Sequence, residues 1–336
     1  MTHPCSIAPN LWPLFAAALV WPGGSALAQT YPDKPVRIVI GFAPGGAVDF
    51  VARLVGQKLT ESMGQAFVIE NRPGAATSIS AERVARAAAD GHTLLLLPIS
   101  TAVQSAVRKK LPYDLQRDIA PISQISIGPL LLVAHPSLPV RGIKDLIALA
   151  RSRPGKLEWS SPGIGSANHF AGELLNLQTK VTMLHVPFKG SSEAVIAAAT
   201  GQVSLCITSL AAATPMLQSG RLRPLAFTTA ARVAALPEVP TIAEAAIPGF
   251  DYFTWYGLAA PAATPKNIVT RLNSEVGRIT KLPDVKTALE RQGMVAQPGT
   301  PEEFAAVIGR TIEQTATLIK AAGAQARMSQ TVRDLR

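Results

Sequence analysis

Short apolar runs alternate with amphipathic segments along most of this 336-residue chain. The runs VRIVIGF, AFVIEN and HTLLLLP (residues 36–42, 66–71 and 92–98) are rich in residues that favour strands. Between them, apolar residues recur at helical spacing over residues 48–63 and 78–89. Because strands that alternate with helices form parallel sheets, the first third of the chain predicts a β-α-β-α-β unit.

A second series repeats this alternation. The runs LEWSSPG, VTMLHVPF, VSLCITS and LRPLAFTT are separated by helical patterns over residues 167–177, 192–200 and 212–218. We therefore predict an α/β protein with two doubly wound domains. No linker or low-complexity segment separates the two series, so we expect the domains to be joined by crossing strands.

The C-terminal part of the chain predicts amphipathic helices. The segment TPEEFAAVIGRTIEQTATLIKAAG opens with a capping box at Thr300 and Glu303, with Pro301 at the first helical position. Its predicted core-facing stripe comprises Phe304, Val307, Ile308, Ile312, Thr315, Leu318 and Ile319. LPDVKTALERQG likewise begins with a proline and ends with a glycine.

These helices need a sheet to cover, and the first domain has only three evident strands. We therefore expect the chain to return to that domain near residues 251–261. Domain 1 is predicted to comprise residues 29–128 and 250–336, and domain 2 residues 129–249.

The N-terminus has the pattern of a secretory signal peptide. An apolar core, LWPLFAAALVW, precedes Ala26 and Ala28, which fit an A-x-A cleavage site with the cut after Ala28. No Lys or Arg precedes the core, which departs from the usual pattern. The alternative is a membrane anchor, but a membrane-spanning helix needs about 20 apolar residues and this apolar core is shorter. We expect a periplasmic protein.

Charge and cysteine content narrow the possible partners. The net charge is +10, but Lys and Arg are spread along the chain without basic runs, which argues against nucleic acid and is compatible with attracting small anions. With Cys5 in the signal peptide, Cys206 is the only remaining cysteine. It lies in an apolar run and is predicted to be a small buried hydrophobic residue.

The turn in RIVIGFAPGGAVDF is a candidate anion site. Pro44, Gly45 and Gly46 interrupt a strand pattern and precede a helix pattern, and the N-terminus of a helix favours negative charge. The alternative is a turn that only reverses the chain. The nucleotide-binding patterns G-x-x-x-x-G-K-[ST] and G-x-G-x-x-G do not occur in this turn.

Two further turns have the same character. EWSSPGIGSANHF places Gly163 and Gly165 between strand and helix with Ser166 at a predicted N-cap, and ENRPGAATS does the same with Gly74 and Thr77. The three turns could converge on one cleft if the domains face each other.

No catalytic pattern appears in the sequence. There is no G-x-S-x-G, no H-E-x-x-H and no paired cysteines, and the histidines are scattered rather than spaced as metal ligands. We predict no catalytic residues, no metal and no cofactor. His169, three residues after Ser166, is the one histidine that we expect near a ligand, either in direct contact or behind the contacting groups.

A succession of motifs along the mature chain is specific enough to suggest a family. The motifs, in order, are YPDKPVRIVIGFAPGGAVDFVARLVGQKL, VIENRPGA, DGHTLL, VPFKG, GQV, GRLRPLAFTTAARVAALPEVPTIAEAAIPGF, WYGLAAPAATP and TPEEFAAVI. They resemble the Bug-type substrate-binding proteins of tripartite tricarboxylate transporters. The resemblance implies a periplasmic-binding-protein-like (type II) fold that closes on a small carboxylate in an interdomain cleft.

The resemblance also implies which residues bind the ligand. In domain 1 they belong to the first two strand-to-helix loops, and in domain 2 to the G-x-G-[ST] turn, the P-[YF]-K-G turn and a nearby strand end. The matching positions are Phe42, Ala43, Pro44, Gly45, Gly46, Asp49, Ala75, Ala76, Thr77, Gly163, Gly165, Ser166, His169, Pro187, Lys189, Gly190 and Thr208. Asp49 is expected to brace its loop, because a bare carboxylate would repel an anion.

This chain departs from the family where the ligand is expected to be selected. Members often carry Ala-Pro-Ala and an Asp after the KG motif, and an Asp-Asn pair after GQV. Here Ser191, Ser192, Glu193 and Ala197 stand in the first segment, and Thr208 and Ser209 in the second. Since the acidic partner for an ammonium group is lost at Thr208, we expect a carboxylate without an amino group.

Three functions remain open from the sequence. The leading one is a receptor, expected to be monomeric, that delivers a carboxylate to the two membrane subunits of a transporter. The others are a ligand-presenting partner of a membrane sensor and an enzyme acting on a small organic acid.

Overall fold

Two β-sheets organise the part of the chain that the structure describes. The computed structural model describes residues 1–3, 31–108 and 110–321, and the described residues from Tyr31 onward belong to one structural unit. Apart from its first three residues, the predicted signal peptide lies outside the described residues. Within these ranges, no helix has the length and apolar character needed to cross a membrane.

The first sheet has six strands in the order β11-β4-β10-β3-β1-β2. The strands are β1 (Val36–Ile40), β2 (Phe67–Asn71), β3 (Thr93–Pro98), β4 (Ile119–Pro129), β10 (Phe253–Pro261) and β11 (Val295–Ala296). β1 pairs in parallel with β2 and β3, as the alternation predicts, whereas β10 runs antiparallel to β3 and β4. Through β10 the chain returns to its first sheet.

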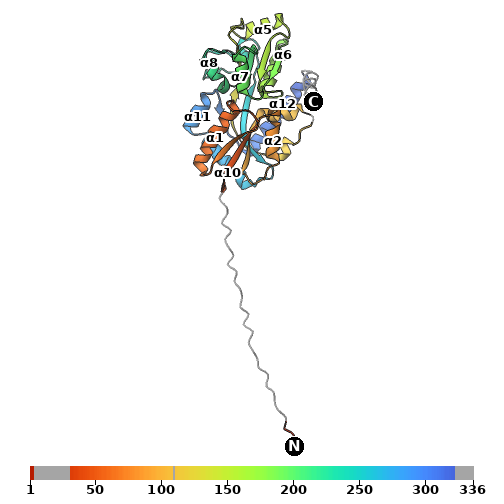
Figure 1. Cartoon of the computed structure of the whole chain (residues 1–336), viewed down its shortest axis with the longest axis vertical. Helices are drawn as coiled ribbons and strands as arrows, with labels where there is room; N and C mark the ends of the chain where they lie inside the picture. The colour runs from red at the N-terminus through yellow and green to blue at the C-terminus, as the bar shows by residue number, and fades with distance from the viewer. Residues whose placement is uncertain (4–30, 109, 322–336) are drawn as a thin grey trace. The chain divides into compact units, whose positions relative to one another are not determined.

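Helices cover both faces of this sheet because its strands are apolar on both sides (Figure 1). In β1, Ile38 packs in the core with α1 (Ala47–Met63), α10 (Lys266–Ile279) and α11 (Pro283–Glu290). Its neighbour Val39 packs in the opposite core with α2 (Ser78–Ala85), α3 (Ile99–Val107) and α12 (Pro301–Ala321). A short helix, α4 (Leu115–Asp118), precedes β4. We call this sheet with α1–α4 and α10–α12 lobe 1.

The second sheet has five strands in the order β7-β6-β8-β5-β9. The strands are β5 (Leu131–Ala134), β6 (Glu158–Ser161), β7 (Leu184–Pro187), β8 (Leu205–Thr208) and β9 (Arg223–Phe227). On one face lie α5 (Ile143–Ser152), α6 (Ala167–Thr179) and α9 (Ile242–Ala245), and on the other α7 (Ser191–Ala199) and α8 (Leu210–Gln218). Cys206 is fully buried in β8. We call this sheet with α5–α9 lobe 2.

Two chain segments connect the lobes. The first passes from β4 through Leu130 into β5, and the second leads from β9 through residues 228–252 into β10. Thr228 joins them, because its Oγ1 accepts a hydrogen bond from the Leu130 N–H (3.0 Å) and donates to the Tyr252 carbonyl (2.6 Å). The two-lobed α/β architecture predicted from the sequence is present, whereas the exact domain boundaries stay a prediction.

The last helix begins as its sequence predicts. The Thr300 N–H donates to Glu303 Oε2 (2.8 Å) and the Glu303 N–H donates to Thr300 Oγ1 (3.1 Å), which together form the capping box. Phe304 is fully buried against Trp255 of β10. The expectation for Leu318 is wrong: its side chain is 38 % exposed, because Thr315 and Ile319 take the buried side of these last turns.

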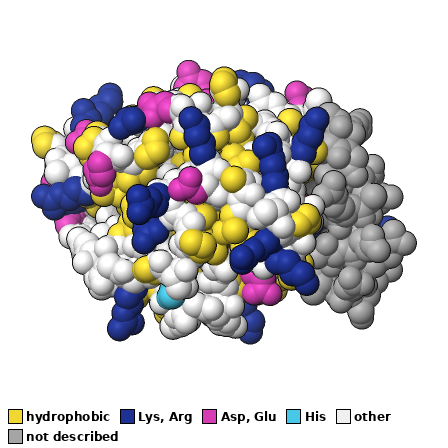
Figure 2. All heavy atoms as spheres, turned by 90° about the horizontal axis from the view of Figure 1, so that it is seen from above, with side chains coloured by type: hydrophobic (Ala, Val, Ile, Leu, Met, Phe, Trp, Pro, Cys, Tyr) yellow, Lys and Arg dark blue, Asp and Glu magenta, His cyan; other side chains and the backbone are white. Residues whose placement is uncertain are grey.

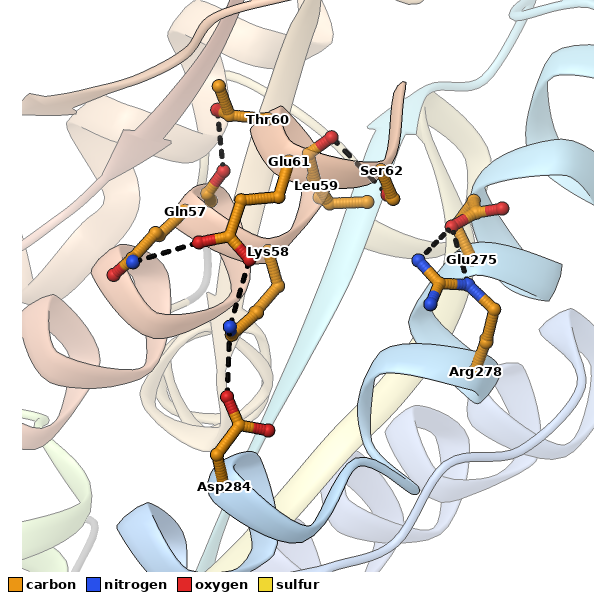
Figure 3. A network of polar contacts seen from close by, with 10 residues as sticks. Gln57, Lys58, Leu59, Thr60, Glu61, Ser62, Glu275, Arg278 and Asp284 are labelled. Atoms are coloured by element: carbon orange, nitrogen blue, oxygen red, sulfur yellow. Dashed lines mark hydrogen bonds and ion pairs between the residues drawn. The ribbon is translucent and has the colours of Figure 1, made fainter. Parts of the chain in front are cut away.

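Charged side chains are dispersed over the surface. Figure 2 shows Lys and Arg scattered across one face with Asp and Glu between them. Where α1 ends, the Lys58 ammonium lies 2.9 Å from both Glu61 Oε2 and Asp284 Oδ2, which ties α1 to the start of α11 (Figure 3). The expectation that nucleic acid is not a partner stays a prediction.

Candidate functional site

The loop Phe42–Gly46 leaves the end of β1 and leads into α1. Gly45 has φ +90°, a conformation that glycine adopts without strain, and Gly46 is the N-cap of α1. The loop is braced from behind by Asp49, which accepts hydrogen bonds from the Gly45 N–H (3.2 Å) and from Asn71 Nδ2 (3.1 Å). Asn71 Nδ2 also donates to the Phe42 carbonyl (3.1 Å).

Asp49 is buried but its charge is compensated. Arg53 donates to both of its carboxylate oxygens at 2.9 Å. Burial alone would raise the pKa of Asp49, but the hydrogen bonds from Arg53, Asn71 and Gly45 lower it below its ordinary value. The carboxylate is therefore ionised at pH 7, and its hydrogen bonds hold the loop in place.

The second loop of lobe 1 is a strained turn. Ala75, Ala76 and Thr77 all have positive φ (47°, 46° and 86°), which is unfavourable for residues with a side chain. Thr77 is fully buried, and its hydroxyl lies 2.8 Å from that of Thr101 in α3. A side chain at Gly41 would collide with Thr77, so the turn is fixed against the end of β1.

The turn between β6 and α6 uses most of its polar groups internally. The Gly163 N–H donates to Ser161 Oγ (3.2 Å), and the Gly165 N–H donates to His169 Nδ1 (3.1 Å). Ser166 caps α6, because its Oγ accepts a hydrogen bond from the His169 N–H (3.2 Å). Gly163, Gly165, Ser166 and His169 therefore form one locally bonded unit.

Two histidines and a tryptophan lie behind this turn. The ring of His185 lies 4.3 Å from that of His169 and 4.4 Å from that of Trp159, and its Nε2 is 2.7 Å from Ser161 Oγ. Burial lowers the pKa of His169 to about 4, and burial together with His169 lowers the pKa of His185 to about 2. Both rings are thus neutral at pH 7. No local pattern in the sequence indicates that His185 lies beside His169.

The P-[YF]-K-G turn of lobe 2 meets the first loop of lobe 1. Gly190 approaches Ala43 so closely that an added Cβ would lie 2.7 Å from the Ala43 Cβ. Ser192 Oγ donates to the Pro44 carbonyl (2.8 Å). Pro187 and Lys189 are exposed, and the Lys189 N–H donates to Glu193 Oε2 (3.2 Å).

A small cavity of about 30 Å³ lies between the lobes. Its lining includes the N-terminal residues of five helices: α1, α3, α6, α7 and α8. The lining residues are Phe42, Gly46, Ala47, Val48, Pro98, Ile99, Ser100, Leu130, Pro162, Ala167, Asn168, Ser191, Ser209, Thr254 and Tyr256. None of these described residues is charged.

Several polar groups of the lining can donate hydrogen bonds. Ser100 Oγ accepts from the Ala167 N–H (3.0 Å) and Ser209 Oγ from the Ala212 N–H (3.4 Å), so each hydroxyl keeps its proton for another acceptor. Burial raises the pKa of Tyr256 to about 12, so its phenol is protonated at pH 7. The first turn of each helix adds N–H groups that have no partner within the helix. This lining suits an anion.

The structure distributes the predicted site residues over three places. Phe42 and Gly46 line the cavity, whereas Ala43, Pro44, Gly45 and Gly190 lie where the loops of the two lobes meet. The remaining residues lie outside the lining, and Thr208 ends β8 directly before the lining residue Ser209. Ligand contact by the whole set stays a prediction.

Sequence reasoning missed the contribution of α3. Pro98 ends β3, and Ile99 and Ser100 follow it at the start of α3; all three line the cavity, but this junction contains no glycine and so lacks the Gly-rich pattern of the other turns. A proline and a hydroxyl at the end of the third parallel strand, at the same sheet edge as the first two loops, are the signal that could have indicated it. Within the described ranges, no group of three or more His, Cys, Asp or Glu is placed to hold a metal ion.

Two doubly wound lobes, joined by two crossing segments and enclosing a cavity at their strand ends, define a periplasmic-binding-protein-like fold. The chain belongs to the family of tripartite tricarboxylate transporter receptors (TctC), whose model matches residues 51–324. This confirms the resemblance found in the sequence. The family is one of receptors rather than enzymes.

Individual relatives agree with this assignment. BugT from Bordetella pertussis (strain Tohama I) is 34 % identical over 89 % of this chain and 92 % of its own. The structure of R. palustris Rpa4515 with adipate is 36 % identical, with a TM-score of 0.85 over 87 % of this chain and 98 % of that one. MatC (Rpa3494) from Rhodopseudomonas palustris with bound malate is 33 % identical, with a TM-score of 0.81 over 86 % and 100 % of the two chains.

Proposed function

We propose that this protein is a periplasmic receptor that binds a small carboxylate between its lobes and delivers it to the two membrane subunits of a tripartite tricarboxylate-type transporter. The observation that carries the proposal is the convergence of five helix N-termini on a cavity whose described lining has no charged side chain. Helix N-termini carry partial positive charge and free N–H groups, so together they attract an anion.

The lining also indicates how the ligand is held. The hydroxyls of Ser100 and Ser209 can donate to carboxylate oxygens, while Phe42, Val48 and Leu130 offer apolar surface to a carbon chain. Adipate and malate, the ligands of the two related structures, combine carboxylates with a short carbon chain. The predicted contacts from Phe42–Gly46, residues 75–77 and the turns of lobe 2 belong to the same proposal.

We further propose that the ligand lacks an amino group. A ligand ammonium needs an acidic partner, and the described lining contains none. Asp49 is committed to Arg53 and to the Gly45 N–H. Adipate and malate have no amino group either.

The remaining elements of the proposal concern location and mode of action. Cleavage after Ala28 would release residues 29–336 into the periplasm. In this mature chain, domain 2 would span residues 129–249 and domain 1 the remainder. There the protein would act as a monomer, by binding alone and without catalysis. The family to which the chain belongs supports this role.

A thermal-shift screen tests the ligand class. Mono-, di- and tricarboxylates, including adipate and malate, are compared with amino acids of matched length. A ligand at one hundred times its dissociation constant stabilises the fold by about 2.7 kcal/mol, which raises the melting temperature measurably. If none of the carboxylates raises the melting temperature, or if amino acids bind more tightly in calorimetry, the proposed ligand class is wrong.

Removing one hydroxyl from the cavity lining tests whether the ligand binds there. Ser191 lines the cavity at the start of α7, so Ser191→Ala should weaken binding of the best carboxylate several-fold with little change in melting temperature without ligand. Ser219→Ala, at an exposed position after α8, is the control and should bind as the unmodified protein does. If the unmodified protein and both variants bind the carboxylate equally well, this cavity is not the binding site.

A further inference from the structure

The cavity is bordered by a seam along which the two lobes contact each other. We define the closure seam as Ser100 and Gln104 of α3 against residues 164–167 of lobe 2, together with residues 43–45 against residues 190–192. Each contact joins groups from different lobes, so each exists only while the lobes lie together.

Gln104 contributes a nearly fully buried side chain to the seam. Its side chain is 1 % exposed, and its Nε2 donates to the carbonyl of Ile164 in the β6–α6 turn (3.1 Å). The next residue, Gly165, has φ +78°, and a Cβ there would lie 2.0 Å from Gln104 Nε2. The turn therefore has the conformation and the free space that the glutamine side chain requires.

Ser100 supports this contact from the same helix face. It precedes Gln104 by four residues, so both side chains point the same way from α3. Its Oγ accepts the Ala167 N–H (3.0 Å), so α3 binds both a carbonyl and an N–H of the β6–α6 segment. At the exposed end of the seam, Ser192 Oγ donates to the Pro44 carbonyl (2.8 Å), and Gly45 leaves room for that hydroxyl.

One polar atom of the closure seam makes closure of the lobes less favourable. Gln104 Oε1 is buried without a hydrogen-bond partner, so closing the seam removes this acceptor from water without replacing its hydrogen bond. One favourable and one unfavourable contribution to closure therefore meet at Gln104. The contacts of the seam join protein atoms only, so they can form without a ligand between the lobes.

From this arrangement we infer that Gln104 is a positioning residue that holds the two lobes closed without touching the ligand, and that the closed form is populated before any carboxylate binds. The inference rests on the proposed function, because it concerns access to the same cavity. A cavity of about 30 Å³ holds about two water molecules, so a ligand the size of adipate enters only after the seam separates.

Distance measurements between the lobes test this inference without a ligand. Spin labels on Lys144→Cys in lobe 2 and Lys281→Cys in lobe 1, both exposed positions, report the separation by double electron–electron resonance. Cys206 is buried and stays unlabelled, and Cys5 is replaced by serine. Gln104→Met removes the hydrogen bond and keeps the length of the side chain. Gln57→Met, which loses a hydrogen bond within lobe 1, is the control.

We expect a short and a long distance in the unmodified protein. Gln104→Met leaves the Ile164 carbonyl without its donor but also removes the unpartnered Oε1, so it should lower the ratio of closed to open molecules about twofold to fivefold, and Gln57→Met should leave it unchanged. Ser192→Ala should shift the ratio the same way, and it carries the test if Gln104→Met does not fold. A ratio unchanged in these seam variants, or an unmodified protein without the short distance, overturns the inference.

The distance measurements and the thermal-shift screen can fail independently, so they separate the role of Gln104 from the proposed ligand class. A role of Gln104 in fold stability alone would lower the melting temperature and leave the distance ratio as it is. If the ratio shifts but no carboxylate raises the melting temperature, the seam is real and the ligand class is wrong. Faster association of adipate with Gln104→Met, in proportion to its larger open fraction, would link the seam to ligand entry.

Discussion

At the scale of single residues, His169 and His185 make the fold sensitive to acid. Burial keeps both rings neutral, with pKa values of about 4 and about 2, whereas an unfolded histidine titrates near 6.5. Between these values the unfolded chain binds more protons than the folded one. The contribution to stability is therefore fully present above about pH 6.5 and is lost as the pH falls, down to about 4 for His169 and to about 2 for His185.

The expected loss is about 1.4 kcal/mol per pH unit for each histidine. Chemical denaturation at pH 7.5, 6.5, 5.5 and 5.0 measures it. His169→Asn can still accept the Gly165 N–H and should flatten the pH dependence by about one proton. A slope that is identical in His169→Asn would show that this ring is not the group that titrates.

Asp49 gives a second prediction at this scale. Asp49→Ala removes the acceptor of the Gly45 N–H and leaves Asn71 with one partner fewer, so we expect unfolding to become easier by about 1–3 kcal/mol. Glu61→Ala on the same helix breaks the ion pair of the exposed Glu61 with Lys58 and should destabilise the protein less than Asp49→Ala does. Urea denaturation compares the two, and equal effects would mean that the bracing of the loop adds nothing.

These residues show what could be predicted of the site. The loop with Gly45 was found because glycine marks a turn before a helix, and Asp49 was expected to brace it because of its charge. His185 and Gln104 could not be found in this way. Their roles depend on which strands and helices the fold brings together, and nothing in their local sequence distinguishes them from surface residues.

At the scale of elements, the capping box of α12 is a local feature with a measurable contribution. Thr300→Ala removes the acceptor of the Glu303 N–H and should lower the free energy of unfolding by about 1 kcal/mol. Thr317→Ala, at an exposed position in the same helix, should change it by less than about 0.5 kcal/mol. A Thr300→Ala variant as stable as Thr317→Ala would show that α12 is held by its packing alone.

The strand β4 was not predicted from the sequence because of polar residues within it. β4 contains Ser123, Gln124 and Ser126, which are buried although polar, so its sequence has no continuous apolar run. Ser123 Oγ compensates its burial by hydrogen bonds to the carbonyls of Gln124 and Gly299, and Gly299 lies far away in the sequence. The pattern of apolar residues predicts strands such as β1 and β3. It does not predict a strand whose buried polar groups form hydrogen bonds with residues far away in the sequence.

At the scale of the whole molecule, Thr228 ties together the two segments that cross between the lobes. It is 1 % exposed, its backbone N–H donates to the Leu130 carbonyl (3.0 Å), and its carbonyl accepts from the Tyr252 N–H (2.8 Å). The hydroxyl adds the contacts to the Leu130 N–H and the Tyr252 carbonyl. If the lobes separate at the closure seam, we expect the two crossing segments to stay bonded to each other through Thr228.

Thr228→Val keeps the shape of the side chain and removes the hydroxyl, so a buried N–H of Leu130 loses its acceptor. We expect a loss of about 1–3 kcal/mol in the free energy of unfolding. Hydrogen exchange at the Leu130 amide should accelerate more than exchange at core amides such as that of Leu95, because the opening is local. Thr229→Val, at the neighbouring, partly exposed position, removes only a solvent-exposed hydrogen bond to the Ala231 carbonyl and should change neither quantity. If Leu130 and Leu95 accelerate equally, Thr228 stabilises the fold as a whole and does not specifically hold the crossing segments together.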